Sequence, residues 1–182
     1  MLKEDKNEKR LERHSTTQED FTPPAIVEDM LAKLPQEAFT DFSKTMLDNS
    51  CGIGNFLVRI LEKRLDYCKD VDDAISAIKT LYGVELMADN VEECRQRLYD
   101  LIVQKFPEIT NDYKKNYYLR ALIRNRIQWH DSLKFDYKHW KPLSHTTPCE
   151  KHETISFHET KEKDDNEYPM WHETKPVQMT LF

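Results

Sequence analysis

The segment LDNSCGIGNFLVRIL, residues 47–61, places Gly52 and Gly54 two positions apart in a chain of 182 residues that has three glycines in all. The apolar residues of KTMLDNS before the glycines predict a short strand, and Leu57 and Ile60 after them recur at helical spacing. Glycine is favourable where the backbone turns tightly or approaches a ligand. The segment therefore predicts a strand, a glycine turn and a helix. Such a turn serves either to bind a ligand or only to connect the two elements.

The same alternation of strands and helices continues on both sides of this turn. Pro23 and Pro24 suit the start of a preceding helix. Its predicted buried face consists of Ile26, Val27, Met30, Leu31 and Leu34. LYGVEL (81–86) and RIQWHDSL (126–133) predict two more strands, separated by helices. Asp89 and Glu92 are spaced as a capping box for the first of these helices. The pattern favours an α/β fold in which helices cover a parallel sheet.

Composition divides the chain into three parts. Charged residues make up 33% of it and apolar residues 38%, and the net charge is −6. We expect residues 1–16 to be a charged extension, residues 17–142 the folded domain, and residues 143–182 a largely disordered acidic tail. A net negative charge provides no general attraction for nucleic acid, so any such binding needs a local basic patch.

Cysteine usage and the absence of long apolar runs predict the compartment. Cys51, Cys68, Cys94 and Cys149 form no CxxC pair, so we expect free thiols and no metal site. No run of 18 apolar residues occurs, and the N-terminus lacks the apolar run of a signal peptide. The sequence thus predicts a cytoplasmic protein with no membrane segment.

Four ordered segments, FTPPAIVEDML, LDNSCGIGNFL, LYGVEL and HDSL, together resemble a known family. Over roughly residues 17–135 the chain resembles the methyltransferases that modify the exocyclic amine of adenine in DNA, above all the modification subunits of restriction systems. The resemblance implies an abbreviated Rossmann-like class I methyltransferase domain that binds S-adenosylmethionine. It also implies DNA methylation as the activity and DNA as the substrate.

The resemblance assigns cofactor-binding roles to particular residues. In the family, the Phe-Thr-Pro segment contacts the methionine end of the cofactor, an acidic residue corresponding to Glu85 binds the ribose, and the aspartate corresponding to Asp131 receives the adenine amine. Asn49 and His130 stand where the family has proline and glycine. The implied cofactor-binding residues are Phe21, Thr22, Pro23, Asp48, Ser50, Cys51, Gly52, Gly54, Asn55, Phe56, Glu85, Leu86, Met87, Asp131, Ser132 and Leu133.

The catalytic motif of this family is missing from the chain. No Asn/Asp-Pro-Pro-Tyr/Phe segment follows HDSL, so the catalytic residues are unknown. Three interpretations remain open. The chain is a methyltransferase with a divergent motif or a partner subunit that completes it, an inactive cofactor-binding protein that modulates restriction-modification or replication, or an α/β domain without a cofactor.

Two further segments predict macromolecular partners. Basic and aromatic residues alternate in YKKNYYLRALIRNRIQWH (113–130), which suits nucleic acid binding through Lys114, Lys115, Arg120, Arg124 and Arg126. The alternative is a helix with a solvated basic face. The last residues, QMTLF, resemble the peptides that dock bacterial replication proteins on the sliding clamp, through Gln178, Leu181 and Phe182. The alternative is a tail end that packs on its own domain.

Overall fold

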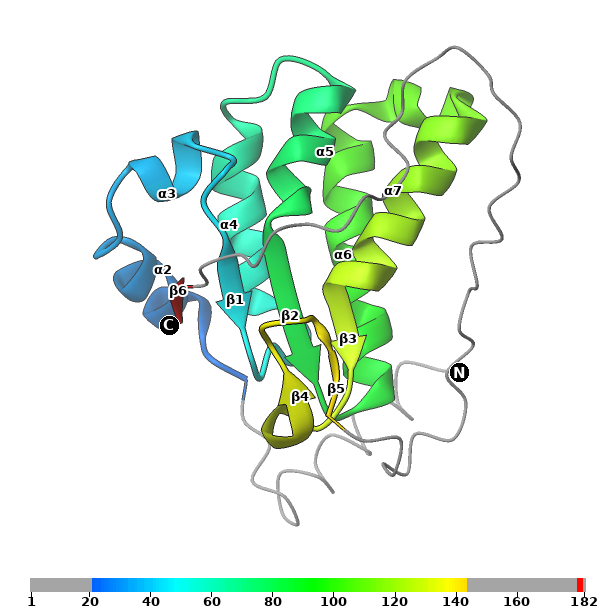
Figure 1. Cartoon of the computed structure of the whole chain (residues 1–182). Helices are drawn as coiled ribbons and strands as arrows, with labels where there is room; N and C mark the ends of the chain where they lie inside the picture. Colours follow the sequence, from blue (N-terminus) through cyan, green and yellow to red (C-terminus); the bar gives the residue numbers. More distant parts are fainter. Residues whose placement is uncertain (1–20, 144–179, 182) are drawn as a thin grey trace, which may run out of the picture.

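The computed structural model describes residues 21–143 and the backbone of Thr180–Leu181 (Figure 1). Its centre is a parallel sheet with the order β3-β2-β1-β6. The strands are Met46–Asp48 (β1), Leu81–Glu85 (β2), Ile127–Trp129 (β3) and Thr180–Leu181 (β6). A separate antiparallel pair joins Phe135–Asp136 (β4) to Lys141–Pro142 (β5). The predicted α/β class with a parallel sheet is confirmed. The predicted extension 1–16 and most of the tail 143–182 lie outside the described residues.

Helices precede β1 and fill the connections from β1 to β2 and from β2 to β3. They are Pro24–Leu31 (α2), Glu37–Thr40 (α3), Asn55–Leu65 (α4), Val71–Lys79 (α5), Ala88–Lys105 (α6) and Tyr113–Arg126 (α7), with 3₁₀ turns at Pro107–Asn111 (η1) and Ser132–Lys134 (η2). In the view of Figure 1, α4 and α6 stand behind the sheet, and α2 and α3 lie beside β1. The order β3-β2-β1 with intervening helices is that of one half of a doubly wound Rossmann sheet.

The main core lies between the sheet and these helices. Leu57 and Ile60 of α4 are buried there, as their helical spacing predicts, and so is Leu98 of α6. The prediction for α2 was partly wrong, because Ile26 and Met30 remain 48% and 42% exposed. The eight-residue α2 buries only a narrow line of its side chains in the core. Ile26 and Met30, on the same predicted face, therefore stay exposed.

The predicted capping box at the start of α6 was also wrong. α6 begins at Ala88, directly after Met87, and Asp89 lies in its first turn. The Met87 amide donates instead to the carboxylate of Glu85, at 2.8 Å. This bond to the end of β2 fixes the start of the helix, and Asp89 lies two positions after the N-cap residue Met87, too late to serve as the cap.

Arg64 ties the amino ends of the strands together. Its side chain is fully buried, and its guanidinium donates to the carbonyls of Ala38, Ala77 and Lys44 and to the hydroxyl of Thr80, at 2.7–3.2 Å. Burial lowers the pKa of Arg64 to about 10, so the group stays charged at neutral pH. One cation therefore holds α3, α5 and the segments entering β1 and β2.

Tyr82 of β2 anchors the β4–β5 pair to the sheet. Trp140 meets its ring edge-on at 4.6 Å, and the guanidinium of Arg126 lies 4.7 Å from the ring centroid. Trp140 also donates to the carbonyl of Asn125, at 2.8 Å. The chain directly after β3 is thus folded back against β2, and up to residue 143 it adds no strand to the main sheet.

Candidate functional site

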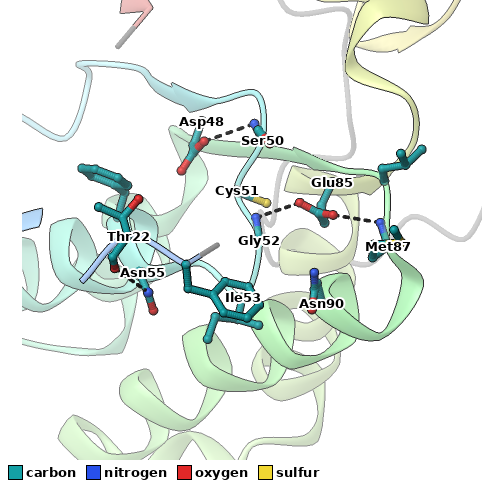
Figure 2. Close-up of a pocket in the computed structure, with 13 residues that line it drawn as sticks. Thr22, Asp48, Ser50, Cys51, Gly52, Ile53, Asn55, Glu85, Met87 and Asn90 are labelled. Carbon is teal, nitrogen blue, oxygen red and sulfur yellow. Dashed lines mark hydrogen bonds between the residues drawn. The ribbon is translucent and has the colours of Figure 1, made fainter. Parts of the chain in front are cut away.

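A cavity of about 350 Å³ lies where β1 and β2 end, at the carboxyl edge of the sheet (Figure 2). Ligands of open α/β sheets bind at this edge, and the volume is at the small end of the range for small-molecule sites. The residues that line the cavity are Phe21, Thr22, Asp48, Ser50, Cys51, Gly52, Ile53, Asn55, Phe56, Glu85, Leu86, Met87 and Asn90.

The glycines allow the turn after β1 to lie close beneath the cavity. Gly52 and Gly54 have φ angles of +52° and +83°, which favour glycine, and the Gly54 amide closes the turn on the carbonyl of Cys51 at 2.7 Å. A Cβ on Gly54 would lie 2.5 Å from Sγ of Cys94, and one on Gly83 would lie 2.9 Å from Sγ of Cys51. Gly54 and Gly83 therefore serve close packing between the turn, β2 and α6.

Glu85, the last residue of β2, is locked in place by backbone amides. Its Oε2 accepts from the Gly52 amide and its Oε1 from the Met87 amide, both at 2.8 Å (Figure 2). Its side chain is buried, with 8% exposed. These two bonds join the glycine turn to the start of α6 and fix the orientation of the carboxylate at the cavity wall.

Asp48, the last residue of β1, has less support. Its Oδ1 accepts from the Ser50 amide at 3.2 Å. Burial, opposed in part by this hydrogen bond, raises the pKa of Asp48 above its usual value, and the nearby charge of Glu85 raises it further. The described residues that line the cavity include no basic side chain. Two carboxylates thus face a cavity that would favour a cationic ligand.

The opposite wall is held by a chain of polar contacts. Asn55 donates to the carbonyl of Thr22 at 3.0 Å, and Arg97 of α6 donates to the Asn55 amide oxygen at 2.8 Å and to the carbonyl of Ile53 at 2.7 Å. A Cβ on Gly52 would lie 3.2 Å from the ring of Phe21. These contacts hold Phe21 and Thr22 over the glycine turn, although the two segments are far apart in the sequence.

The structure brings most of the predicted cofactor-binding residues together around the cavity. Pro23, Gly54, Asp131, Ser132 and Leu133 are not among its lining residues. Conversely, the sequence prediction missed Ile53 and Asn90. Ile53 was recognisable because it lies between the two glycines, whereas no local pattern marks Asn90, which reaches the cavity from α6. The backbone amides of Cys51, Gly52 and Gly54 already donate within the protein, so they are not available for a ligand carboxylate.

Asp131 has a structural role in this conformation. Its Oδ1 accepts from the Leu133 amide at 3.0 Å, and it pairs with Lys134 at 3.1 Å, so it caps the η2 turn. The hydrogen bond with Lys134 is the main cause that lowers the pKa of Asp131. The residue still follows β3, whose Trp129 is in register with Glu85, so it lies at the same edge of the sheet as the cavity.

The basic residues predicted to bind nucleic acid fall into two groups. Lys115 pairs with Asp72 at 2.8 Å, and Arg126 is buried, where it donates to the carbonyl of Lys79 at 2.6 Å. These two hold α7 against α5 and β2. Lys114, Arg120 and Arg124 are exposed.

The end of the chain returns to the sheet. Thr180–Leu181 pairs in parallel with β1, in the register Met46↔Thr180 and Leu47↔Leu181. This is the arrangement expected if the tail end packs on its own domain. Gln178 and Phe182 lie outside the described residues, and the clamp-binding role of QMTLF stays a prediction.

Cys51, Cys68 and Cys94 are free thiols, and the hydrogen bond with Cys94, together with burial, raises the pKa of Cys51. Residues 21–143 hold no group of three His, Cys, Asp or Glu side chains placed to bind a metal ion. No helix in that same part is long and apolar enough to cross a membrane.

Comparison of the chain with models of protein families, with curated proteins and with solved structures gave no match.

Proposed function

We propose that this chain binds S-adenosylmethionine in the cavity at the ends of β1 and β2. The observation that carries the proposal is the pair Asp48 and Glu85, which face a cavity with no basic lining residue among the described ones. S-adenosylmethionine is cationic at its sulfonium sulfur and at its ammonium group, so the acidic cavity complements its charge. The resemblance of the surrounding segments to DNA adenine methyltransferases supports the same ligand.

Each carboxylate has a role suited to its surroundings. Glu85, held by the Gly52 and Met87 amides, keeps lone pairs that can accept from the two ribose hydroxyls. Asp48, whose pKa is raised in the absence of a ligand, is stabilised by an ammonium group placed beside it. Leu86 and Met87 offer apolar surface to the adenine ring. When bound, the cofactor supplies an activated methyl group for transfer.

Transfer to the exocyclic amine of adenine in DNA is the activity that the resemblance implies, and we propose it for this chain together with a partner. From β3 to residue 143 the chain forms the β4–β5 pair and adds no strand to the main sheet, and the strand that joins the sheet later, Thr180–Leu181, pairs with β1 and not with β3. The groups that hold the acceptor amine would therefore come from a partner chain.

The second candidate is a cofactor-binding protein that transfers no methyl group. It is favoured by the pairing of β1 with Thr180–Leu181, because this places the chain's own end at the sheet edge where a completing strand would join.

The direct test is isothermal titration calorimetry with S-adenosylmethionine, comparing the wild type with Asp48→Asn and Glu85→Gln. Each variant should bind about 10 to 100 times more weakly, because each loses a charged hydrogen-bond acceptor in the wall of the cavity. Adenosine, which lacks the methionine end, separates the two roles. Glu85→Gln should weaken adenosine binding, and Asp48→Asn should leave it unchanged.

Matched controls remove exposed carboxylates elsewhere. Asp29→Asn and Glu37→Gln should leave the affinity unchanged, since both residues are exposed on other helices. If wild-type protein does not bind S-adenosylmethionine, or if the controls weaken binding as strongly as the cavity variants, the proposal is wrong. Transfer of labelled methyl groups to DNA, with and without a partner chain, then distinguishes the enzyme from the inactive binding protein.

A further inference from the structure

One stripe of α7 gathers aromatic and basic side chains on its exposed surface. Tyr113, Tyr117, Arg120 and Arg124 follow one another at intervals of four, three and four residues, which places them on one face of the helix. Tyr113 and Tyr117 are 81% and 52% exposed, and their rings stack at a centroid distance of 6.4 Å and an angle of 22°. Along this face of the helix, two exposed rings are thus followed by two exposed guanidinium groups.

A groove of about 320 Å³ runs beside this stripe, between α6 and α7. Its lining includes Arg95, Arg120 and Arg124, the rings of Tyr99 and Tyr117, and one acidic residue, Glu92. The groove therefore has a net positive charge, although the chain as a whole carries −6. Its volume is that of a small-ligand site, and it is separate from the acidic cavity.

The groove is built by contacts that hold its cations in place. Arg95 donates to the carbonyl of Ile127 at 2.7 Å and pairs with Glu92 at 2.6 Å, so its charge is fixed at the base of the groove. The guanidinium of Arg120 lies 3.8 Å from the ring centroid of Tyr99, and its Nε donates to the Asn116 side chain at 3.3 Å. These side chains are ordered before any ligand binds, which reduces the entropy cost of binding.

The structure also separates this stripe from the other basic residues of the helix. Lys115 and Arg126 point elsewhere and hold α7 to its neighbours. A uniformly solvated basic face would show no such division. Of the basic residues, Lys114, Arg120 and Arg124 remain exposed, and the two arginines follow the aromatic pair beside the preformed groove.

We propose that α7 and the α6–α7 groove bind single-stranded nucleic acid. Bases stack on the Tyr113–Tyr117 pair, and Arg120 and Arg124 contact the phosphates, with Arg95 contributing a fixed positive charge. Aromatic rings that accept any base, alternating with cations that follow the backbone, are the recognised means of binding single strands without sequence preference. The separate position of the groove makes this binding independent of the proposed cofactor.

Fluorescence anisotropy with labelled twelve-nucleotide oligo-dT and oligo-U strands tests the proposal on the full chain. We expect saturable binding to a single strand at low salt. Arg120→Gln/Arg124→Gln should weaken binding at least about tenfold and make the log–log salt dependence shallower by about 1.4, as expected for two lost phosphate contacts to a single strand. Tyr113→Ala/Tyr117→Ala should weaken it by about tenfold or more with the salt dependence unchanged, because stacking is lost.

The control variant Lys33→Gln/Lys44→Gln removes the same charge from exposed positions near α2 and α3 and should change the affinity less than about twofold. Circular dichroism checks that each variant is folded, and the exposed tyrosine pair gives a test that does not depend on the arginines. Absence of binding to both strands, equal weakening by the control, or equally tight binding of the mononucleotide dTMP or of a duplex would overturn the proposal. S-adenosylmethionine titrations of the same variants should be unchanged, so failure here is distinct from failure of the proposed function.

Discussion

The two ends of the parallel sheet both bury charge, and they treat it differently. At the amino end, Arg64 is fully buried, and every nitrogen of its guanidinium donates to a carbonyl or hydroxyl oxygen. At the carboxyl end, Asp48 accepts from one amide at 3.2 Å and has Glu85 as a neighbour of like charge. The first charge is satisfied by the fold, whereas the second lies beside a cavity.

This difference indicates which charge serves stability and which is suited to the proposed binding. A buried charge that the protein satisfies itself holds elements together, and its removal leaves several acceptors without a donor. A carboxylate that stays poorly satisfied beside an open cavity lowers stability until a cation binds. The two ends should therefore respond to mutation in opposite directions.

Arg64→Met should give the largest effect on stability. Loss of the guanidinium leaves the carbonyls of Ala38, Ala77 and Lys44 buried without donors, and we expect the free energy of unfolding to fall by about 3–5 kcal/mol. Urea denaturation followed by circular dichroism measures it. Arg59→Met in the same helix is the matched control, because Arg59 forms exposed ion pairs with Glu28 and Glu62 that contribute about 1 kcal/mol or less. Equal effects of the two variants would contradict a special role for Arg64.

Gly54→Ala should come next, because it disturbs the turn on which the carboxyl end is built. The positive φ of Gly54 and the position of its missing Cβ, 2.5 Å from Sγ of Cys94, together predict a loss of about 2–4 kcal/mol. The double variant Gly54→Ala/Cys94→Ala should be less destabilised than the two single variants added together, since it removes the sulfur. Strict additivity in the same denaturation measurements would exclude the clash as the cause.

Asp48→Asn should stabilise the ligand-free protein while weakening the proposed binding of S-adenosylmethionine. The pKa of Asp48 is raised above 3.8 in the folded state, so its contribution to stability is full below pH 3.8 and is lost as the pH rises through the folded-state pKa. The variant, which cannot ionise, should therefore have a higher Tm than the wild type at pH 7 and no advantage below pH 3.8. Thermal unfolding between pH 3 and 8 checks this, with Asp29→Asn as the control. A lower Tm at pH 7 would mean that the charge of Asp48 is satisfied.

The carboxyl end was largely predictable from the sequence, and the amino end was not. The glycine turn, Asp48 and Glu85 are local signals, because backbone conformation and strand ends are encoded within a few residues. Arg64 falls in a helix next to Lys63 and looks like an ordinary surface cation, since its acceptors come from distant segments. The exposure of Ile26 and Met30 and the start of α6 at Ala88 also depend on contacts between elements, which periodicity does not report.

Asp131 offers the smallest effect and the sharpest comparison between sequence and structure. The family resemblance assigns it to the adenine amine, whereas the structure shows it capping η2 and pairing with Lys134, outside the cavity lining. Asp131→Asn should change the Tm less than Asp48→Asn does, and the small difference should vanish in acid, because the lowered pKa of Asp131 contributes stability that is full above the unfolded value of 3.8 and is lost as the pH falls through the lower folded-state pKa. Calorimetry then decides its role. An S-adenosylmethionine affinity within about twofold of the wild type supports the structural role, and a loss as large as that of Glu85→Gln would show that the η2 turn rearranges to bring Asp131 onto the cofactor.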